Sequence, residues 1–231
     1  MKETLLVTGS NRGIGLELVR QYAEAGWHVH ACCRHPDQAG DLRALANIHA
    51  NIQTHELDVT NRDQLAALAR TLHGQPIDLL FNNAGTYGQD DAVFGNTDES
   101  RWIEAMRVNV IAPMKLMETF VDAVAASRHR LIATLSSKMG SMADNGSGGS
   151  YVYRSSKAAL NAILKSAAID LQPRGIRVAI LHPGWVKTAM GGPHAEITTG
   201  ESVAAMRRIL ADMRVEDSGT FFDIDGSVIP W

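Results

Sequence analysis

The chain is poor in cysteine: among its 231 residues the only two are the neighbours Cys32 and Cys33. Adjacent cysteines inside an apolar run cannot cross-link distant segments, so they argue against a disulfide-stabilised fold and favour a reducing, cytoplasmic location. The chain also lacks any apolar run of about eighteen residues, the length that a membrane-spanning helix needs. Its first residues enter a strand-like run at once, so neither a membrane anchor nor a signal peptide is predicted.

A strong charge of either sign is missing as well. The 22 basic and 25 acidic residues leave a net charge of −3, which gives no electrostatic reason to expect nucleic acid or an anionic membrane as a partner. The nine histidines include the alternating pair His28 and His30. No third ligand follows this pair at a zinc-like spacing, so no metal site is predicted.

Short apolar runs alternate with helical patterns along the whole chain, in which 45% of residues are hydrophobic. Strands are predicted at residues 4–8, 27–33, 52–59, 77–82, 131–136, 176–182 and 220–224, and helices at 14–24, 37–46, 61–72, 98–127, 151–171 and 201–213. The strands are nearly continuous apolar runs, as expected where both faces of a sheet are covered. This pattern predicts a single α/β domain over residues 1–231, a Rossmann-type three-layer sandwich with about seven parallel strands.

A glycine-rich turn joins the first predicted strand to the first helix. Gly9 permits a tight turn, Gly13 allows the backbone to approach a pyrophosphate, and Gly15 allows close packing of helix on strand. The N-terminus of the helix adds N–H groups without partners and a partial positive charge. The place of the turn favours a dinucleotide site over an ordinary glycine-rich loop. The predicted cofactor-binding residues here are Gly9, Ser10, Asn11, Arg12, Gly13, Ile14 and Gly15.

A tyrosine and a lysine lie one helical turn apart in the helix predicted at 151–171. Carbonyl reduction needs an acid that protonates the forming alkoxide, and a tyrosine can fill this role if its pKa falls from about 10. A decrease of roughly three units corresponds to about 4 kcal/mol. Lys157 lies on the same helical face as Tyr153 and can supply part of this stabilisation. Tyr151 has only Ser155 at the same spacing, so Tyr153 is predicted as the acid and base, and Tyr151 as a cleft wall or packing residue.

Three motifs occur in one order: Thr8-Gly9-x-x-x-Gly13-x-Gly15, then Asn82-Asn83-Ala84-Gly85, then Tyr153-x-x-x-Lys157. In this combination the chain resembles the short-chain dehydrogenase/reductases over its whole length. The resemblance implies a Rossmann-type sheet with a nicotinamide cofactor across the carboxyl ends of its strands. It also implies a homodimer or homotetramer, paired through the long helices at 98–127 and 151–171.

The cofactor preference is predicted from the end of the second strand, which reads Ala31-Cys32-Cys33-Arg34. NAD-binding proteins usually place an acid here to hold the ribose 2′-hydroxyl, and none is present. Arg34, together with Arg12 of the turn, suits a 2′-phosphate, since a guanidinium matches phosphate geometry. NADPH is therefore expected in preference to NADH, with solvated surface arginines as the alternative interpretation.

The resemblance assigns further cofactor contacts. It implies that Asp58 accepts a hydrogen bond from the adenine amino group. Taken alone, Asp58 could be a helix cap, but its place at the end of the third strand favours the adenine contact. Val59 follows Asp58, and the ribose side is expected to be lined by Asn83, Ala84 and Gly85. The segment near the nicotinamide is expected to contribute Pro183, Gly184, Val186 and Thr188, while Tyr153 and Lys157 also contact the cofactor.

The resemblance completes the catalytic set with two more residues. Ser137, just past the fifth strand, is expected to donate to the substrate carbonyl and the Tyr153 oxygen, with Ser136 as an alternative. Its separation from Tyr153 is longer than is usual in the family, and a loop at 144–150 accounts for the difference. Asn109 matches the asparagine that holds a water in a proton relay to Lys157, or it is simply one polar residue in a helix.

Finer resemblance is to the carbonyl-reductase-like branch that includes the sniffer and C-factor proteins, carried by 151–161, 140–145 and the ending 225–231. The segment between Thr188 and Glu201 is short, which implies an open substrate cleft. Met142, Trp185 and Met190 suggest apolar aldehydes, ketones, dicarbonyls or quinones.

Two other functions stay open at this point. One is NADP(H) sensing or signalling with little turnover, which the intact Ser137, Tyr153, Lys157 and Asn109 argue against. The other is NAD-linked alcohol oxidation, which Cys33 in place of an acid disfavours.

Overall fold

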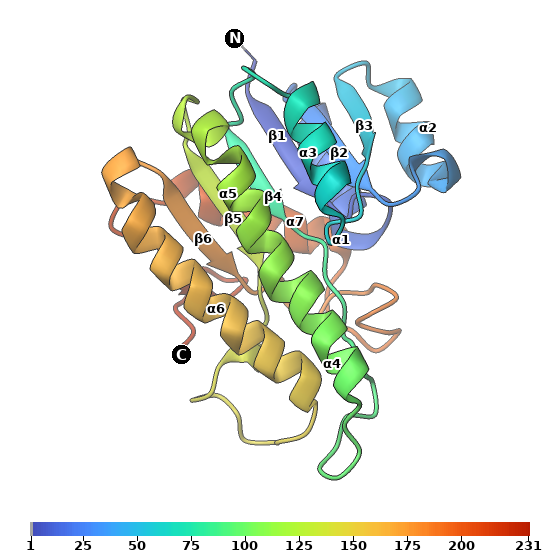
Figure 1. The fold of residues 1–231 in the computed structure, drawn as a ribbon, viewed down its shortest axis with the longest axis vertical. Helices are drawn as coiled ribbons and strands as arrows, with labels where there is room; N and C mark the ends of the chain where they lie inside the picture. The colour runs from blue at the N-terminus through green and yellow to red at the C-terminus, as the bar shows by residue number, and fades with distance from the viewer. Residues whose placement is uncertain (1) are drawn as a thin grey trace.

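The protein was analysed as a computed structural model that describes residues 2–231 (Figure 1). Seven strands form one sheet in the order β3-β2-β1-β4-β5-β6-β7, and every neighbouring pair is parallel. The strands are β1 Thr4–Thr8, β2 His28–Cys33, β3 Ile52–Glu56, β4 Leu79–Asn82, β5 Leu131–Leu135, β6 Arg177–Leu181 and β7 Phe221–Phe222. The predicted α/β sandwich with about seven parallel strands is confirmed.

Helices cover both faces of the sheet. They are α1 Gly13–Glu24, α2 Gly40–Ile48, α3 Arg62–Thr71, α4 Glu99–Met106, α5 Ala112–Ala125, α6 Tyr151–Leu171 and α7 Thr199–Asp212. Leu18 of α1, Leu42 of α2 and Met206 of α7 belong to one buried cluster, whereas α3, α5 and α6 contribute to the other. Figure 1 shows α3, α5 and α6 in front of the sheet. Within residues 2–231, no helix is both long and apolar enough to cross a bilayer.

The strands alternate between these two clusters. In β1, Leu5 and Val7 face the cluster of α1, α2 and α7, while Leu6 faces the cluster of α3, α5 and α6. Because successive side chains of a strand point to opposite faces, a strand covered on both sides is apolar throughout. The edge strand β3 departs from this expectation, since only Ile52 is buried and the rest of the strand is polar and more exposed.

The order of the strands reverses at β1, which pairs with β2 on one side and with β4 on the other. The connections therefore leave the carboxyl ends of β1 and β4 in opposite directions. Parallel sheets of this kind bind ligands in the crevice that opens at such a point. The fold thus places the glycine turn after β1 beside the segment after β4.

The long helix predicted at 98–127 is interrupted. α4 and α5 are separated by a π-helical turn over Arg107–Ile111, and Asn109 lies within it. Pro113 has no N–H, so an α-helix could not form its usual bond from position 113 to the Asn109 carbonyl oxygen. The wider turn accommodates this loss, and such turns are frequent at functional sites.

Other boundaries also moved. The helix predicted at 37–46 became a 3₁₀ turn, Pro36–Gln38, followed by α2. The strand predicted to reach residue 59 ends at Glu56, and the last strand is reduced to two residues. Asn61 caps α3, since its side chain accepts hydrogen bonds from the backbone of Asp63 and Gln64.

Candidate active site

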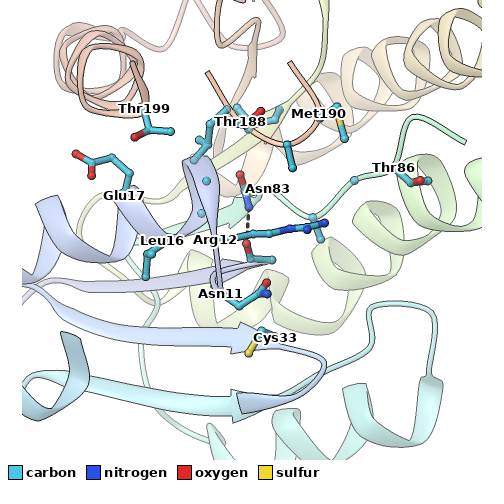
Figure 2. A pocket seen from close by; sticks show the side chains of 18 of the residues that line it. Asn11, Arg12, Leu16, Glu17, Cys33, Asn83, Thr86, Thr188, Met190 and Thr199 are labelled. Carbon is cyan, nitrogen blue, oxygen red and sulfur yellow. Dashed lines mark hydrogen bonds between the residues drawn. The ribbon is translucent and has the colours of Figure 1, made fainter. Parts of the chain in front are cut away.

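A cleft of ≈1120 Å³ opens at the carboxyl ends of the strands (Figure 2). The glycine turn after β1 forms one of its walls. Gly9 and Gly13 have φ angles of 67° and 56°, which favour glycine. A Cβ on Gly15 would lie 2.1 Å from the Gly9 carbonyl oxygen, so α1 approaches the turn as closely as the backbone permits.

Asn83 ties this turn to the segment after β4. Its side-chain nitrogen donates to the carbonyl oxygens of Thr8, at 2.8 Å, and Gly9, at 3.1 Å. In return, the buried Thr8 hydroxyl accepts from the backbone nitrogens of Asn83 and Ala84. Figure 2 shows the Asn83 side chain directed toward the turn. Asn83 therefore holds the turn through its carbonyl oxygens, while the Ser10 N–H donates to the Cys32 carbonyl oxygen at 3.1 Å.

The N-terminus of α1 lies on the cleft without a side-chain cap. Arg12 occupies the capping position, and its side chain makes no capping hydrogen bond. The first N–H groups of a helix have no partners within the helix, and the helix dipole adds partial positive charge at this end. The arrangement suits the phosphates of a dinucleotide.

Cys33 and Arg34, at the end of β2, line the cleft together with Asp58. Partial burial acts to raise the pKa of Asp58. Hydrogen bonds from the Thr60 hydroxyl and backbone, with the charges of Arg34 and His35, outweigh it and hold this pKa below its usual value. Asp58 is thus a carboxylate on the cleft wall that accepts hydrogen bonds from the Thr60 nitrogen and hydroxyl. Position 33 itself holds a thiol where an NAD-binding protein usually has an acid.

Arg12 and Asn11 point in different directions. In Figure 2 the Asn11 side chain is directed toward Cys33, whereas Arg12 extends across the cleft toward the side of Thr86 and Met190. Of the two arginines predicted to contact a 2′-phosphate, only Arg34 lies at the end of β2. Arg12 lies along the cleft beside the glycine turn instead.

The catalytic candidates lie beyond β5. Tyr153, on the first turn of α6, is buried, and the nearby side chain of Ser137 acts to lower the pKa of its phenol. Lys157 is also buried, with its Nζ 5.7 Å from the centroid of the Tyr153 ring and 2.8 Å from the Leu135 carbonyl oxygen, to which it donates. Tyr153 and Lys157 both line the cleft.

Burial sets the titration of this pair in the free protein. It raises the pKa of Tyr153 to about 12, against the lowering effect of the Ser137 hydrogen bond, and it lowers the pKa of Lys157 to about 8. We expected Lys157 to stabilise the phenolate from the adjacent helical turn. In the free protein, loss of hydration outweighs this effect, and the phenol stays protonated at neutral pH.

The two serines after β5 have different partners. Ser136 is buried, and its hydroxyl donates to Asn161 Oδ1 at 2.5 Å. The Ser137 hydroxyl contacts Tyr153 and accepts from the backbone nitrogen of Met139. Ser136, and not Ser137, lines the cleft, but its hydroxyl is engaged by Asn161, so Ser137 remains the expected partner of Tyr153.

Asn109 is held rigidly in the π-helical turn. Its amide donates to the Thr86 carbonyl at 2.8 Å and to the Ser156 hydroxyl at 3.0 Å, and its Oδ1 accepts from the Thr86 nitrogen. A Cβ on Gly85 would lie 3.3 Å from Asn109 Oδ1 and 3.9 Å from Lys157 Nζ. Gly85 therefore lies close to both Asn109 and Lys157, and it has no side chain that would come between them.

A family model described as short chain dehydrogenase matches residues 3–197 of the chain. The chain belongs to the short chain dehydrogenase family. The family and its sheet, expected from the order of three motifs, are confirmed.

Solved structures of carbonyl reductases are similar to this chain over its full length. The Carbonyl reductase Sniffer of D. melanogaster matches with a TM-score of 0.91 and 32% identity, covering 100% of both chains. The NADPH-bound carbonyl reductase from chicken fatty liver matches with a TM-score of 0.91 and 33% identity, again over 100% of both chains. C-signal of Myxococcus xanthus is 38% identical over 167 residues, which are 72% of this chain and 100% of that protein.

Most of the predicted site residues of this dehydrogenase meet on the cleft. Its lining includes Gly9, Asn11, Arg12, Gly13, Ile14, Gly15, Arg34, Asp58, Val59, Asn83, Ala84, Gly85, Tyr153, Lys157, Pro183 and Thr188. Those outside the lining are Ser10, Asn109, Ser137, Gly184 and Val186. Ser10 is turned away from it, because its buried hydroxyl donates to the Cys32 carbonyl. Asn109 and Ser137 reach the site through the hydrogen bonds described above.

The apolar residues expected around the substrate are divided. Met190 lines the cleft and is about half exposed, as is Trp185. Trp185 and Met142 lie outside the lining, and the indole nitrogen of Trp185 donates to the Gly191 carbonyl. The segment after Thr188 forms no helix before α7, in keeping with a lightly covered cleft.

Sequence reasoning missed Tyr87. Its ring stacks on the ring of Tyr153, with centroids 4.5 Å apart and an angle of 18° between the planes. No periodicity marks this residue, which lies in an irregular segment two positions after Gly85. Its proximity to the Asn82–Gly85 motif was the one available signal.

Proposed function

We propose that this dehydrogenase reduces the carbonyl group of a small molecule with NADPH, using Ser137, Tyr153, Lys157 and Asn109. The observation that carries the proposal is the common cleft of the glycine turn and the Tyr153–Lys157 pair. A dinucleotide bound at the turn and a substrate at Tyr153 would share this space. The similarity to the NADPH-bound carbonyl reductase from chicken fatty liver supports the same cofactor and reaction.

When bound, the nicotinamide cofactor supplies the hydride. The protein supplies the proton and the orientation. In the free protein Tyr153 is a protonated phenol at neutral pH, which is the form required to protonate the oxygen of a carbonyl as it is reduced. Ser137 fixes the position of that phenol and has a hydroxyl to share with the substrate oxygen.

Lys157 and Asn109 would restore the proton. The ammonium of Lys157 lies beside the Tyr153 ring, and both Lys157 and Asn109 lie close to Gly85. Its pKa of about 8 allows it to release and regain a proton near neutral pH. Pro113 cannot donate a hydrogen bond to the Asn109 carbonyl oxygen, and we propose that this oxygen accepts from a relay water.

The preference for NADPH rests on Cys33 and Arg34. No carboxylate replaces the Cys33 thiol to bind a ribose 2′-hydroxyl, and the exposed Arg34 adds positive charge at the same place. A guanidinium and a 2′-phosphate form charge-assisted hydrogen bonds.

We further propose apolar aldehydes, ketones, dicarbonyls or quinones as substrates, since Met190 lines a lightly covered cleft. A homodimer or homotetramer remains our expectation. The apolar side chains of Ile103, Ile111 and Ile169 are exposed on α4, the π-helical turn and α6.

A second candidate is a signalling protein that binds NADP(H) with little turnover. It is favoured by the 38% identity to C-signal. The complete Ser137–Tyr153–Lys157 constellation argues for turnover, because nucleotide binding alone does not require it.

The test is the loss of reduced-nicotinamide absorbance with NADPH or NADH across a panel of aldehydes, ketones, diketones and quinones, with Tyr153→Phe as the control. Turnover with NADPH that disappears in Tyr153→Phe supports the reductase. Tight NADPH binding without turnover across the panel supports the signalling function instead.

A further inference from the structure

Tyr87 covers one face of the tyrosine proposed as the acid. The two rings are nearly parallel, at 18°, with their centroids 4.5 Å apart. Tyr87 is half-buried and comes from the segment between β4 and α4, whereas Tyr153 comes from α6. Two segments distant in sequence therefore meet at this stacked pair.

Ser150 holds Tyr87 in place. The two hydroxyl oxygens are 2.9 Å apart. Ser150 precedes α6 in the capping position, yet its side chain caps no helix N–H. It adopts the left-handed conformation, with φ 47° and ψ 39°, where glycine would be unstrained. Strain of this kind in a residue other than glycine is typical of functional sites.

Arg154 secures the loop that carries Ser150. Its guanidinium donates to the Ser147 hydroxyl at 2.8 Å and to the carbonyl oxygens of Gly148 and Met139 at 3.3 Å. The loop at 144–150, which is longer than is usual in the family, is thus fastened to the first turn of α6. This fixes Ser150 against Tyr87.

We propose that Tyr87 is a positioning residue for Tyr153. Its ring restricts the orientation of the phenol toward Ser137 and excludes water from one face, and Ser150 sets the place of Tyr87. The inference rests on the proposed role of Tyr153, but the stacking has consequences that can be measured without substrate.

Several groups surround Tyr153 from neighbouring elements. They are Ser137 after β5, Lys157 of α6 and Tyr87 before α4. Glu104 of α4 and Lys187 after β6 line the same cleft. Burial is the largest cause of the raised pKa of Tyr153, and Tyr87 raises it further. Removing the Tyr87 ring should therefore free the motion of Tyr153 and lower its pKa.

The experiment measures the ring-flip rate of Tyr153 by NMR in the full-length protein with labelled tyrosine, assigned by Tyr→Phe variants. In Tyr87→Leu we expect the flip to be about 10-fold faster or more, because the stacked ring is gone. We also expect the phenolate to appear at lower pH. Tyr151→Leu, which removes an aromatic ring two positions from Tyr153, should leave both readouts unchanged.

The Ser150 contact is tested separately by Tyr87→Phe and Ser150→Gly, which keep the stacked ring and delete the same hydrogen bond. Each should speed the flip by the same smaller factor, about two- to threefold, and the double variant should add nothing. These two variants also test the proposal if Tyr87→Leu does not fold.

A wild-type flip rate and phenolate titration in folded Tyr87→Leu would overturn the positioning role, as would additive effects of the two milder variants. An active Tyr153→Phe variant would instead overturn the proposed catalytic function. That result would leave the measured restraint of Tyr153 by Tyr87 unaffected.

Discussion

The cleft is built differently at its two ends. After β1, the backbone shapes it: glycines with positive φ, an uncapped helix N-terminus and a turn secured from behind by Asn83. After β5, buried polar side chains shape it, and the pKa values of Tyr153 and Lys157 are shifted in opposite directions by burial. The first end is sensitive to added atoms, whereas the second is sensitive to protonation and to the loss of single functional groups.

The largest expected effect separates chemistry from binding. Tyr153→Phe removes the proposed proton donor and should reduce kcat by about 10²–10⁴-fold, the usual contribution of general acid catalysis. The dissociation constant for NADPH should stay near its wild-type value, because the glycine turn is untouched. Steady-state kinetics and fluorescence titration of NADPH measure the two quantities. A loss of both kcat and NADPH affinity in Tyr153→Phe would contradict the proposed separation of catalysis and cofactor binding between the two ends of the cleft.

Gly15→Ala tests the backbone end. The added Cβ would lie 2.1 Å from the Gly9 carbonyl oxygen and 2.5 Å from Asn83 Nδ2. Displacing the turn should cost about 3 kcal/mol, which corresponds to about a 100-fold weaker affinity for NADPH. Gly146→Ala is the matched control, since a Cβ there would meet nothing within 4 Å. Equal NADPH affinities in the two variants would show that the close approach does not matter.

Lys157→Met should stabilise the free protein while abolishing turnover. Burial lowers the pKa of Lys157 from 10.5 to about 8. Between these two pH values the unfolded chain binds more protons than the folded protein, so the free energy of unfolding of the wild type rises with pH. Below about pH 8 the folded protein bears the full cost of burying the charged Lys157. That cost is about 3 kcal/mol at pH 7, and the lost hydrogen bond to Leu135 offsets about 1 kcal/mol.

Urea unfolding without cofactor should therefore show Lys157→Met about 2 kcal/mol more stable than wild type at pH 7. The difference should shrink as pH rises toward 10. A variant that is less stable than wild type at pH 7 would refute a burial cost at this lysine.

The smallest expected effect concerns Arg34. Arg34→Ala removes a charge from the exposed end of β2 and should weaken NADPH binding by about tenfold, as expected for loss of a charge-assisted hydrogen bond. NADH affinity should change little, because NADH has no 2′-phosphate. Isothermal titration with both cofactors measures the ratio, and equal losses for the two would count against the proposed preference.

The backbone end could be predicted from sequence more fully than the catalytic end. Glycines such as Gly9 and Gly15 have a spacing that specifies where the chain must turn and approach itself, so their positions carry the geometry. The Tyr153–Lys157 pair was visible for a similar reason, since both residues lie on one helical face. Fold and family followed from the order of these motifs and were confirmed.

What escaped prediction depends on contacts between distant segments. The stacking of Tyr87 on Tyr153 and the bond of Ser136 to Asn161 join elements that no local pattern relates. The π-helical turn at Asn109 arises from Pro113, but a proline near a helix start is equally compatible with a new helix. The raised pKa of Tyr153 in the free protein could not be predicted either, because its largest cause is burial, which sequence does not reveal.

The pairing of β1 with β4 has a consequence for biosynthesis. After its synthesis β1 can soon pair with β2, but its other neighbour begins only at Leu79. Asn83, which secures the turn at Thr8 and Gly9, follows that strand. Because synthesis proceeds at about 5–20 residues per second, the nascent chain waits several seconds for this closure. The turn at Thr8 is thus synthesised 75 residues before the side chain that secures it.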